Sequence, residues 1–338
     1  MALPTLTKTW QFVPNYAIAA TGTAINTNRT ILLAIKNFFT TDAAEWVDNA
    51  NVATTAANLW AVRYSCDSVV AGVAGDGVDR WDSISDLVFA NAASAHSWIV
   101  LRQTAIGSTA EMLISCESVG STGNILTVVI SPSAAFTGGT TTARPTATDE
   151  IAVLNAATWG GVVGTDASVK LHVMKSTDGE CWRVLVCNGG QANTAWIIEK
   201  PAAFASATWT NRLTMYAQGA AAATSTLTNA LLNTAANFQG RGASTMTMYL
   251  AAMYYASGFA NVNVTTANDL SSAWPFMPHQ LVSATASNRG FHGYINDIWY
   301  GSTTVATGST YPATGTQHQF AQLGAMIFPW CQTPIQVT

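Results

Sequence analysis

The densest group of side chains with metal-binding or acid–base chemistry is a run of aspartates. Asp76, Asp79 and Asp82 fall within seven residues, and Asp67 and Asp86 flank them. Carboxylate oxygens are the ligands that Ca²⁺ prefers, so a calcium site is one interpretation of this run. The spacing departs from the D-x-[DN]-x-[DN]-G calcium loop, and Asp and Gly are common turn residues because Asp bonds to its own backbone. We therefore favour a plain loop, and the sequence predicts no metal and no cofactor.

No set of catalytic residues forms a known motif. The sequence contains no G-x-S-x-G, no G-x-x-x-x-G-K-[ST] and no H-E-x-x-H. His96 and Ser97 are neighbours, but adjacent residues of a strand point to opposite faces and do not form a base–nucleophile pair. A glycosidase needs two carboxylates facing one cleft, so polysaccharide hydrolysis is one alternative. We predict that the chain is not an enzyme, because it has only six Glu and twelve Asp, most of them in turn-like contexts.

The cysteines also lack the spacing of a metal site. They form no C-x-x-C pair, and no histidine lies near them at ligand spacing. We expect them to be reduced and buried as small apolar side chains. The five are Cys66, Cys116, Cys181, Cys187 and Cys331.

Aromatic side chains offer a different chemistry, which is stacking on sugar rings. Trp209, Trp274 and Trp299 would be the candidates if they lie exposed at the edge of a sheet. Trp is also a large core residue and a frequent interface anchor, so burial is the interpretation that we favour. Glycan binding through these three side chains stays open as the alternative.

The composition restricts the class of protein. Charged residues make up 9% of the 338 residues, against roughly 25% in an ordinary soluble domain. Hydrophobic residues make up 49%, so the chain has enough apolar surface to bury. The net charge is −4 and the cations are scattered, which argues against a nucleic-acid partner. We see no window of ~18 apolar residues and no signal peptide, so we expect a chain without a membrane partner that folds where it is made.

One helix is expected near the start of the chain, over Thr30 to Phe39. Its apolar residues recur at three- and four-residue spacing and form one stripe. Asn28 or Thr27 is the expected cap of its first turn. The stripe would dock either on the chain's own body or on a neighbouring subunit. It consists of Ile31, Ile35, Phe38 and Phe39.

Beyond Trp46 short runs of β-branched and aromatic residues alternate with turn residues, which predicts strands. The Asp178-Gly179 pair predicts a tight hairpin between two of these strands. Many strands with few helical patterns between them favour antiparallel sheets stacked as a sandwich. We expect an N-terminal arm and helix over 1–45 and a β body over 46–338, with a domain boundary near 136–149 as an alternative. The runs are 59–64, 97–102, 112–114, 125–130, 169–174, 181–187, 195–198, 212–216, 245–255 and 293–300.

Several strings of the sequence resemble uncharacterised structural proteins of tailed-bacteriophage virions. The resemblance implies a capsid-decoration, collar, baseplate or fibre-base protein that is assembled in the host cytoplasm and located in the virion. It carries no catalytic residues. The strings are WDSISDLVFANAASAHSWIVLRQ (81–103), TTARPTATDE (141–150), STDGECWRVLVCNGG (176–190) and GAMIFPW (324–330).

The scarcity of charge agrees with a subunit of this kind, because the cores of protein interfaces are depleted of charged residues. We therefore hypothesise a multi-copy subunit that contacts copies of itself and other virion proteins. It would be mainly β, an antiparallel β-sandwich of the concanavalin-like or jelly-roll type, with its N-terminal arm and helix reaching a neighbour. The alternative is a glycan-binding or receptor-binding module on the particle, whose partner would be a host-surface glycan.

Overall fold

The computed structural model describes residues 8–18, 24–42, 44–48, 50, 52–67, 72–81, 96–103, 111–119, 123–131, 135–148, 151–155, 170–188, 191–199, 213–218, 248–251, 277–283, 290–300, 309–311, 318–323 and 326–330. Within these residues the chain has sixteen strands and one helix, α1 (Ala24–Thr40). All the strand pairs described are antiparallel. The expectation of a mainly β chain with antiparallel sheets and an N-terminal helix is confirmed.

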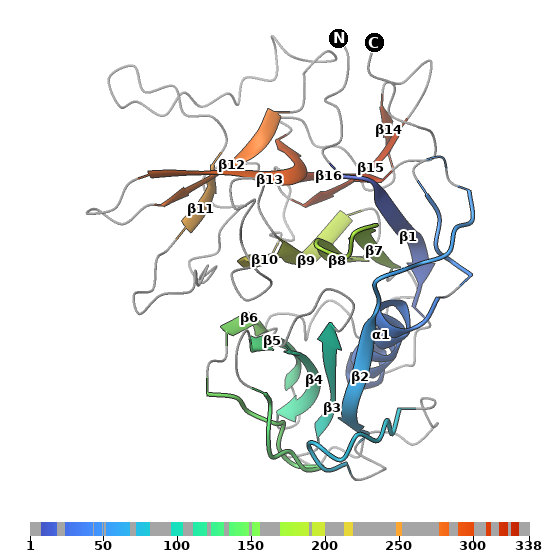
Figure 1. Ribbon diagram of the computed structural model, residues 1–338, viewed down its shortest axis with the longest axis vertical. Helices are drawn as coiled ribbons and strands as arrows, with labels where there is room; N and C mark the ends of the chain where they lie inside the picture. The colour runs from blue at the N-terminus through green and yellow to red at the C-terminus, as the bar shows by residue number, and fades with distance from the viewer. Residues whose placement is uncertain are drawn as a thin grey trace.

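The strands form three sheets, which we name by their position in Figure 1. The lower sheet has the order β2 (Trp60–Cys66), β3 (His96–Gln103), β4 (Glu111–Val119), β5 (Gly123–Ser131) and β6 (Ile151–Asn155). The middle sheet has the order β1 (Trp10–Ala17), β7 (Lys170–Ser176), β8 (Trp182–Asn188), β9 (Gln191–Glu199) and β10 (Leu213–Gln218). The upper sheet has the order β11 (Met248–Ala251), β12 (Met277–Ser283), β13 (Gly290–Tyr300), β16 (Met326–Trp330), β15 (His318–Leu323) and β14 (Ser309–Tyr311).

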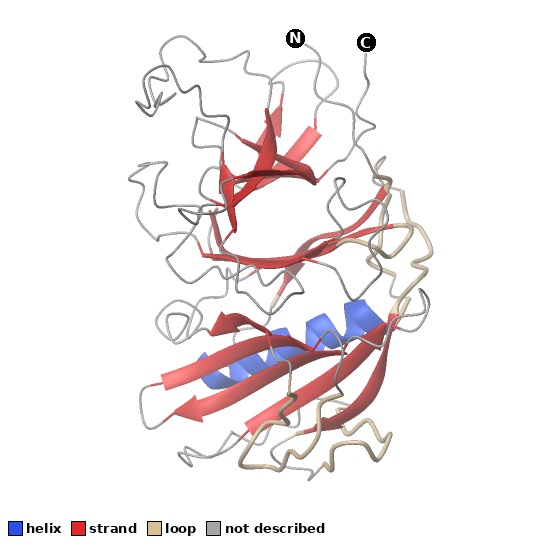
Figure 2. Ribbon diagram, turned by 60° about the vertical axis from the view of Figure 1, so that its left-hand side comes forward, coloured by secondary structure: helices blue, strands red, loops and turns tan. Residues whose placement is uncertain are grey.

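Helix α1 lies between the middle and lower sheets, as Figure 2 shows. It begins at Ala24, six residues before the expected start, so Thr27 and Asn28 lie inside the helix and the prediction that one of them caps it is wrong. Of the residues that this adds to the helix, Asn28 and Arg29 are both fully buried, and Arg29 pairs with Asp67, so tertiary contacts hold this part of α1.

The main core lies where α1 meets the two sheets around it. The stripe of α1 and alternate residues of β3, β4, β7 and β8 form one apolar cluster. Phe39 stacks on Trp182 with 4.2 Å between ring centroids, and Phe38 meets Trp46 edge to face at 6.4 Å. Burying a large apolar side chain contributes about 1.5–3 kcal/mol, so this cluster joins the helix and both sheets into one folded unit.

A second apolar cluster covers the other face of the lower sheet. The segment 135–148, which we call the strap, runs over this face. Gly139 has a φ of 102° and lies against Trp98, where a Cβ atom would collide with the indole ring. The strap covers most of the region 136–149, where the sequence analysis gave a domain boundary as an alternative. Because β5 and β6 on either side of it pair with each other, the strap joins neighbouring strands of one sheet.

The described part of the N-terminal segment belongs to the body of the protein. Strand β1 pairs with β7 at the edge of the middle sheet. On its other side Phe12 exchanges two backbone hydrogen bonds of 2.8 Å with Val47. The segment expected as an arm therefore contributes a strand to the middle sheet and a helix to the main core.

The hairpin predicted at Asp178-Gly179 is confirmed. Gly179 has a φ of 72°, and its N–H donates to the Ser176 carbonyl at 2.9 Å. The turn joins β7 to β8, which pair over their whole length.

Candidate functional site

The apolar stripe proposed as an interface is buried within the chain itself. Ile31, Ile35 and Phe39 are 0% exposed and Phe38 is 2% exposed. All four belong to the main core between the middle and lower sheets. Of the two alternatives for this stripe, the structure shows docking on the chain's own body. This face of α1 is therefore not open to a neighbouring subunit, and the hypothesis that it reaches one is corrected.

The tryptophans proposed for glycan stacking are placed only in part. Trp209 and Trp274 lie outside the described residues. Trp299 lies in β13, where it is the register partner of Pro278 in β12 and of Ile327 in β16. Glycan stacking by these residues stays a prediction.

The aspartate run fastens a loop to the lower sheet and to α1. The Asp79 carboxylate pairs with Lys36 at 2.6 Å and accepts a hydrogen bond from the Ser65 hydroxyl at 2.8 Å. Asp76 pairs with Arg80 at 2.6 Å. Within the residues that the structure describes, no group of three His, Cys, Asp or Glu is arranged to hold a metal ion. Two further aspartates, Asp82 and Asp86, lie outside those residues.

Asp67, at the end of β2, forms a buried ion pair with the first half of α1. Its carboxylate lies 2.5 Å from the Arg29 guanidinium, and the two side chains are 5% and 0% exposed. The same guanidinium lies 5.8 Å from the Trp81 ring centroid, and the Trp81 indole donates to the Cys66 carbonyl at 2.9 Å. This network ties α1, β2 and the loop 72–81 together.

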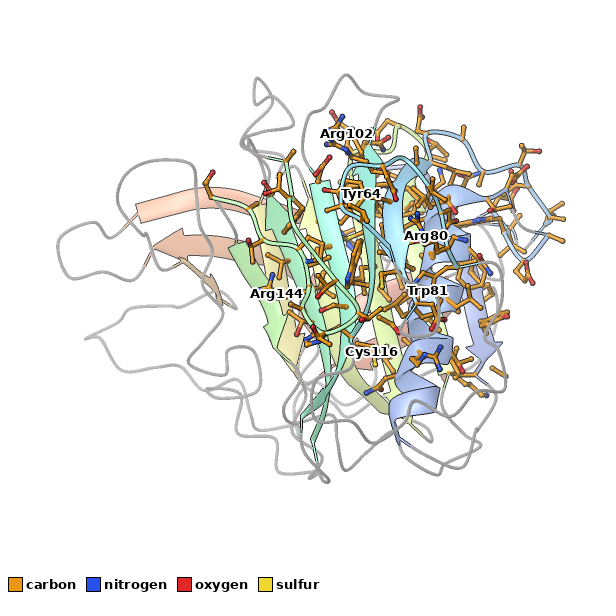
Figure 3. All side chains as sticks on the ribbon, turned by 90° about the horizontal axis from the view of Figure 1, so that it is seen from below. Tyr64, Arg80, Trp81, Arg102, Cys116 and Arg144 are labelled. Carbon is orange, nitrogen blue, oxygen red and sulfur yellow. The ribbon has the colours of Figure 1, made fainter. Side chains whose placement is uncertain are left out.

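A cluster of charges on the outer face of the lower sheet joins three strands to the strap. Glu111 of β4 is 0% exposed, and its Oε1 atom accepts hydrogen bonds from both Arg63 and Arg102, the latter at 2.6 Å. Its Oε2 atom accepts the Phe136 N–H at 2.9 Å, while the Tyr64 hydroxyl donates to the Phe136 carbonyl. Figure 3 shows Tyr64 and Arg102 on this face. The cluster therefore holds one residue of the strap, Phe136, by both its backbone N–H and its carbonyl.

Strand register explains how these charges meet. Arg102 and Glu111 are direct partners in the β3–β4 pair. The register of β2 against β3 shifts between Val62 and Tyr64, so Arg63 lies at a bulge, and bulges re-aim side chains. Burial, together with the charge of Glu111, raises the pKa of Tyr64 to about 12, so its hydroxyl stays a donor. These residues were not identified as a cluster from the sequence, because they lie far apart in the chain and form no sequence motif.

Lys175 is a fully buried cation at the end of the middle sheet. It is the cross-strand partner of Gln11 in β1 and of Trp182 in β8. Its Nζ atom lies 5.8 Å from the ring centroids of both Trp46 and Trp182. Among the described residues Nζ has no hydrogen-bond acceptor, and the Gln11 Oε1 and Trp46 Nε1 atoms are likewise without a partner. Burial lowers the pKa of Lys175 to about 8.

The cysteines fit what was expected of them where the structure describes their side chains. Cys66, Cys116 and Cys181 are buried, which confirms the expectation of burial for these three. The Cys187 side chain and Cys331 lie outside the described residues.

In the described part of the chain, α1 falls short of the length and hydrophobicity that a membrane-spanning helix needs.

Comparison of this chain with protein families, with curated proteins and with solved structures finds no match. Its function is therefore argued from its own residues. The clusters around Glu111, Asp67 and Asp79 each pin a loop or helix to the lower sheet. The charged side chains of these three clusters hold the strap, α1 and the loop 72–81 in place against the lower sheet.

Proposed function

We propose that this chain is a multi-copy structural subunit of a tailed-bacteriophage virion and not an enzyme. It would assemble in the host cytoplasm and contact copies of itself and other virion proteins. The resemblance of four strings to such proteins supports the proposal.

We further propose that the fold is a β-sandwich of the concanavalin-like or jelly-roll type. The antiparallel sheets on two sides of α1 support this proposal.

The observation that carries the proposal is that the chain engages its few cations internally. Eight of its 14 Lys and Arg residues are paired within the chain or fully buried. Apart from Arg63 and Arg102, which stay 29% and 34% exposed, these eight residues give the surface little positive charge. Those engaged are Lys8, Arg29, Lys36, Arg63, Arg80 and Arg102, which form ion pairs, and Lys175 and Arg183, which are buried.

A surface poor in free charge favours contact between copies. Net charge keeps proteins apart in solution, and charged groups are costly to desolvate when two surfaces meet. Interface cores are accordingly depleted of charged residues. A chain that must be packed against many copies of itself benefits from this composition, whereas a solitary soluble protein does not.

Size-exclusion chromatography with light scattering tests the proposal on the full chain. We expect a mass that is a multiple of 35.6 kDa at micromolar concentration. Mass spectrometry of purified virions should then find the chain in many copies per particle. A chain that stays monomeric at every concentration, or that is absent from the particle, would contradict the proposal. Glycan binding that is lost in Trp299→Ala would favour the receptor-binding alternative.

A further inference from the structure

We propose that two surface patches of opposite charge dock on each other between neighbouring copies of this chain. The acidic patch consists of the described residues of 42–52. The basic patch consists of Arg63, Arg102 and the loop 72–78 that runs beside β2. The inference rests on the proposed function, because it identifies the contact that would hold the copies together.

The acidic patch carries negative charge, and within the described residues only Asp42 of its carboxylates acts on a cation of the chain, the buried Lys175. Asp42 and Glu45 are exposed and Asp48 is half-buried. Asp42 accepts the Ala56 N–H at 2.5 Å, and Asp48 accepts the Val52 N–H at 3.0 Å, which fixes the shape of the segment. Among the described contacts none of the three carboxylates forms an ion pair. The patch thus presents carboxylates on a backbone that is already ordered.

The basic patch has one positive charge in excess, because Asp76 of the loop is neutralised by Arg80 and two arginines share the one carboxylate of Glu111. Arg63 and Arg102 are 29% and 34% exposed, and both pair with the single buried carboxylate of Glu111. A guanidinium has five N–H donors, so each arginine keeps donors for a further acceptor. The loop 72–78 runs along the free edge of β2, where the Val78 carbonyl accepts the N–H of Ser65, two residues from Arg63, at 3.3 Å.

The exposed apolar side chains fall in the same two patches. The large hydrophobic residues that lie exposed within the described part of the chain are Val52, Val73 and Val78, at 58%, 62% and 46%. Val52 belongs to the acidic patch, and the other two belong to the basic patch. Each patch therefore combines apolar surface with charge, negative in the acidic patch and positive on balance beside Arg63 and Arg102, which is the arrangement of an interface with an apolar centre and a polar rim.

Charge complementarity identifies the occupant as a second copy. A carboxylate of the acidic patch can accept the N–H groups that Arg63 and Arg102 leave free, while the valines bury each other. Each copy carries both patches, so every copy can both give and receive this contact. If the two patches are used head to tail, the assembly is a ring or an open array, as repeated contacts of one kind produce.

Charge reversal at Glu45 tests the contact without touching a buried group. We expect Glu45→Arg to weaken self-association about tenfold in sedimentation velocity, with the effect shrinking as salt screens the charges. Val78→Ser should weaken it by a similar factor. Thr177→Arg, on the exposed hairpin between β7 and β8, is the matched control and should leave association unchanged. Unchanged circular dichroism and melting temperature would show that the variants fold.

Mixed crosslinking tests which patches meet. Chains with Glu45→Cys and chains with Val78→Cys are mixed with a short bismaleimide, and we expect a crosslinked pair above the level that unsubstituted chains give. Thr177→Cys in place of either partner should give no pair. If the unsubstituted chain is multimeric but Glu45→Arg keeps its affinity and the mixture does not crosslink, this inference is overturned while the proposed function stands. A monomeric unsubstituted chain would overturn both.

Discussion

The guanidinium of Arg183 lies 4.2 Å from the ring centroid of Trp10, and both groups contact the same residue of the upper sheet. The Trp10 indole donates to Asp297 Oδ2 at 2.6 Å, and Arg183 donates to the Asp297 carbonyl at 3.2 Å. The backbone N–H of Lys8 donates to the same Oδ2 atom at 3.1 Å. Asp297 of β13 thus fastens the upper sheet to β1 and β8 of the middle sheet.

We predict that Asp297→Ala loosens the upper sheet. The change removes the acceptor of the buried Trp10 N–H and puts Ala at a φ of 50°, which Asp and Asn tolerate better. We expect a loss of about 3 kcal/mol of unfolding free energy and faster hydrogen exchange in β13. Asp297→Asn keeps an acceptor and tolerates the φ, so it should lose less than about 1 kcal/mol. Equal losses in the two variants would contradict this account.

The sequence predicted the elements whose signal is local. The Asp178-Gly179 hairpin follows from turn chemistry, and the stripe from Ile31 to Phe39 follows from helical periodicity, so both were expected. Eight of the ten strands of the lower and middle sheets likewise fall where runs of β-branched and aromatic residues were predicted as strands, whereas β1 and β6 were not predicted. Whether this stripe docks on the chain's own body or on a neighbouring subunit depends on tertiary packing, and the sequence did not decide between the two.

The polar clusters could not be predicted, because they depend on register and on long-range contacts. Arg102 meets Glu111 only because β3 and β4 pair in one register. Arg29 was overlooked because it precedes the apolar stripe of α1, and its partner Asp67 was placed with the aspartate run. Asp297 reaches Trp10 across almost the whole sequence. Separations of this kind leave no pattern in a single chain.

Removing the charge of Glu111 should loosen the strap. In Glu111→Gln two arginines lose their counter-charge, although the amide oxygen can still accept the Phe136 N–H. We expect a loss of about 2 kcal/mol in urea unfolding, less than for a fully buried pair because Arg63 and Arg102 are partly hydrated. The charge of Glu111 also helps to raise the pKa of Tyr64. The pKa of Tyr64 should therefore fall in this variant, as followed by ultraviolet titration, and an unchanged Tyr64 pKa would argue against the cluster.

Two aspartates that pair with α1 offer a comparison of buried and exposed ion pairs. Asp67→Asn leaves the Arg29 guanidinium buried with its carboxylate partner lost, so we expect a loss of about 3–5 kcal/mol. Asp79→Asn removes a pair whose carboxylate is 30% exposed, and we expect about 1 kcal/mol or less. Thermal and urea unfolding measure both. Similar losses of unfolding free energy in the two variants would show that burial does not determine how much these ion pairs stabilise the fold.

Stability should rise with pH between about 8 and 10 because of Lys175. The folded pKa of Lys175 is lowered from 10.5 to about 8 by burial, so in this range the unfolded chain binds the proton that the folded chain has released. Unfolding then takes up a proton, and the unfolding free energy increases with pH by up to roughly 3 kcal/mol in total. Lys175→Met should abolish this rise. It should also stabilise the protein at pH 7, since it replaces a buried ammonium without an acceptor by an apolar side chain.

Above pH 10 the sign reverses because of Tyr64. Its folded pKa is raised from 10.0 to about 12, first by burial and then by the charge of Glu111. The unfolded chain then loses a proton that the folded chain keeps, so unfolding releases it and the unfolding free energy falls as pH increases. Urea unfolding from pH 7 to 11 should therefore pass through a maximum, with Tyr64→Phe weakening the fall and leaving the rise, because the raised pKa values of Lys8 and Cys66 add to the fall. If the unfolding free energy still rises to the same extent in Lys175→Met and falls to the same extent in Tyr64→Phe, other groups control the alkaline stability.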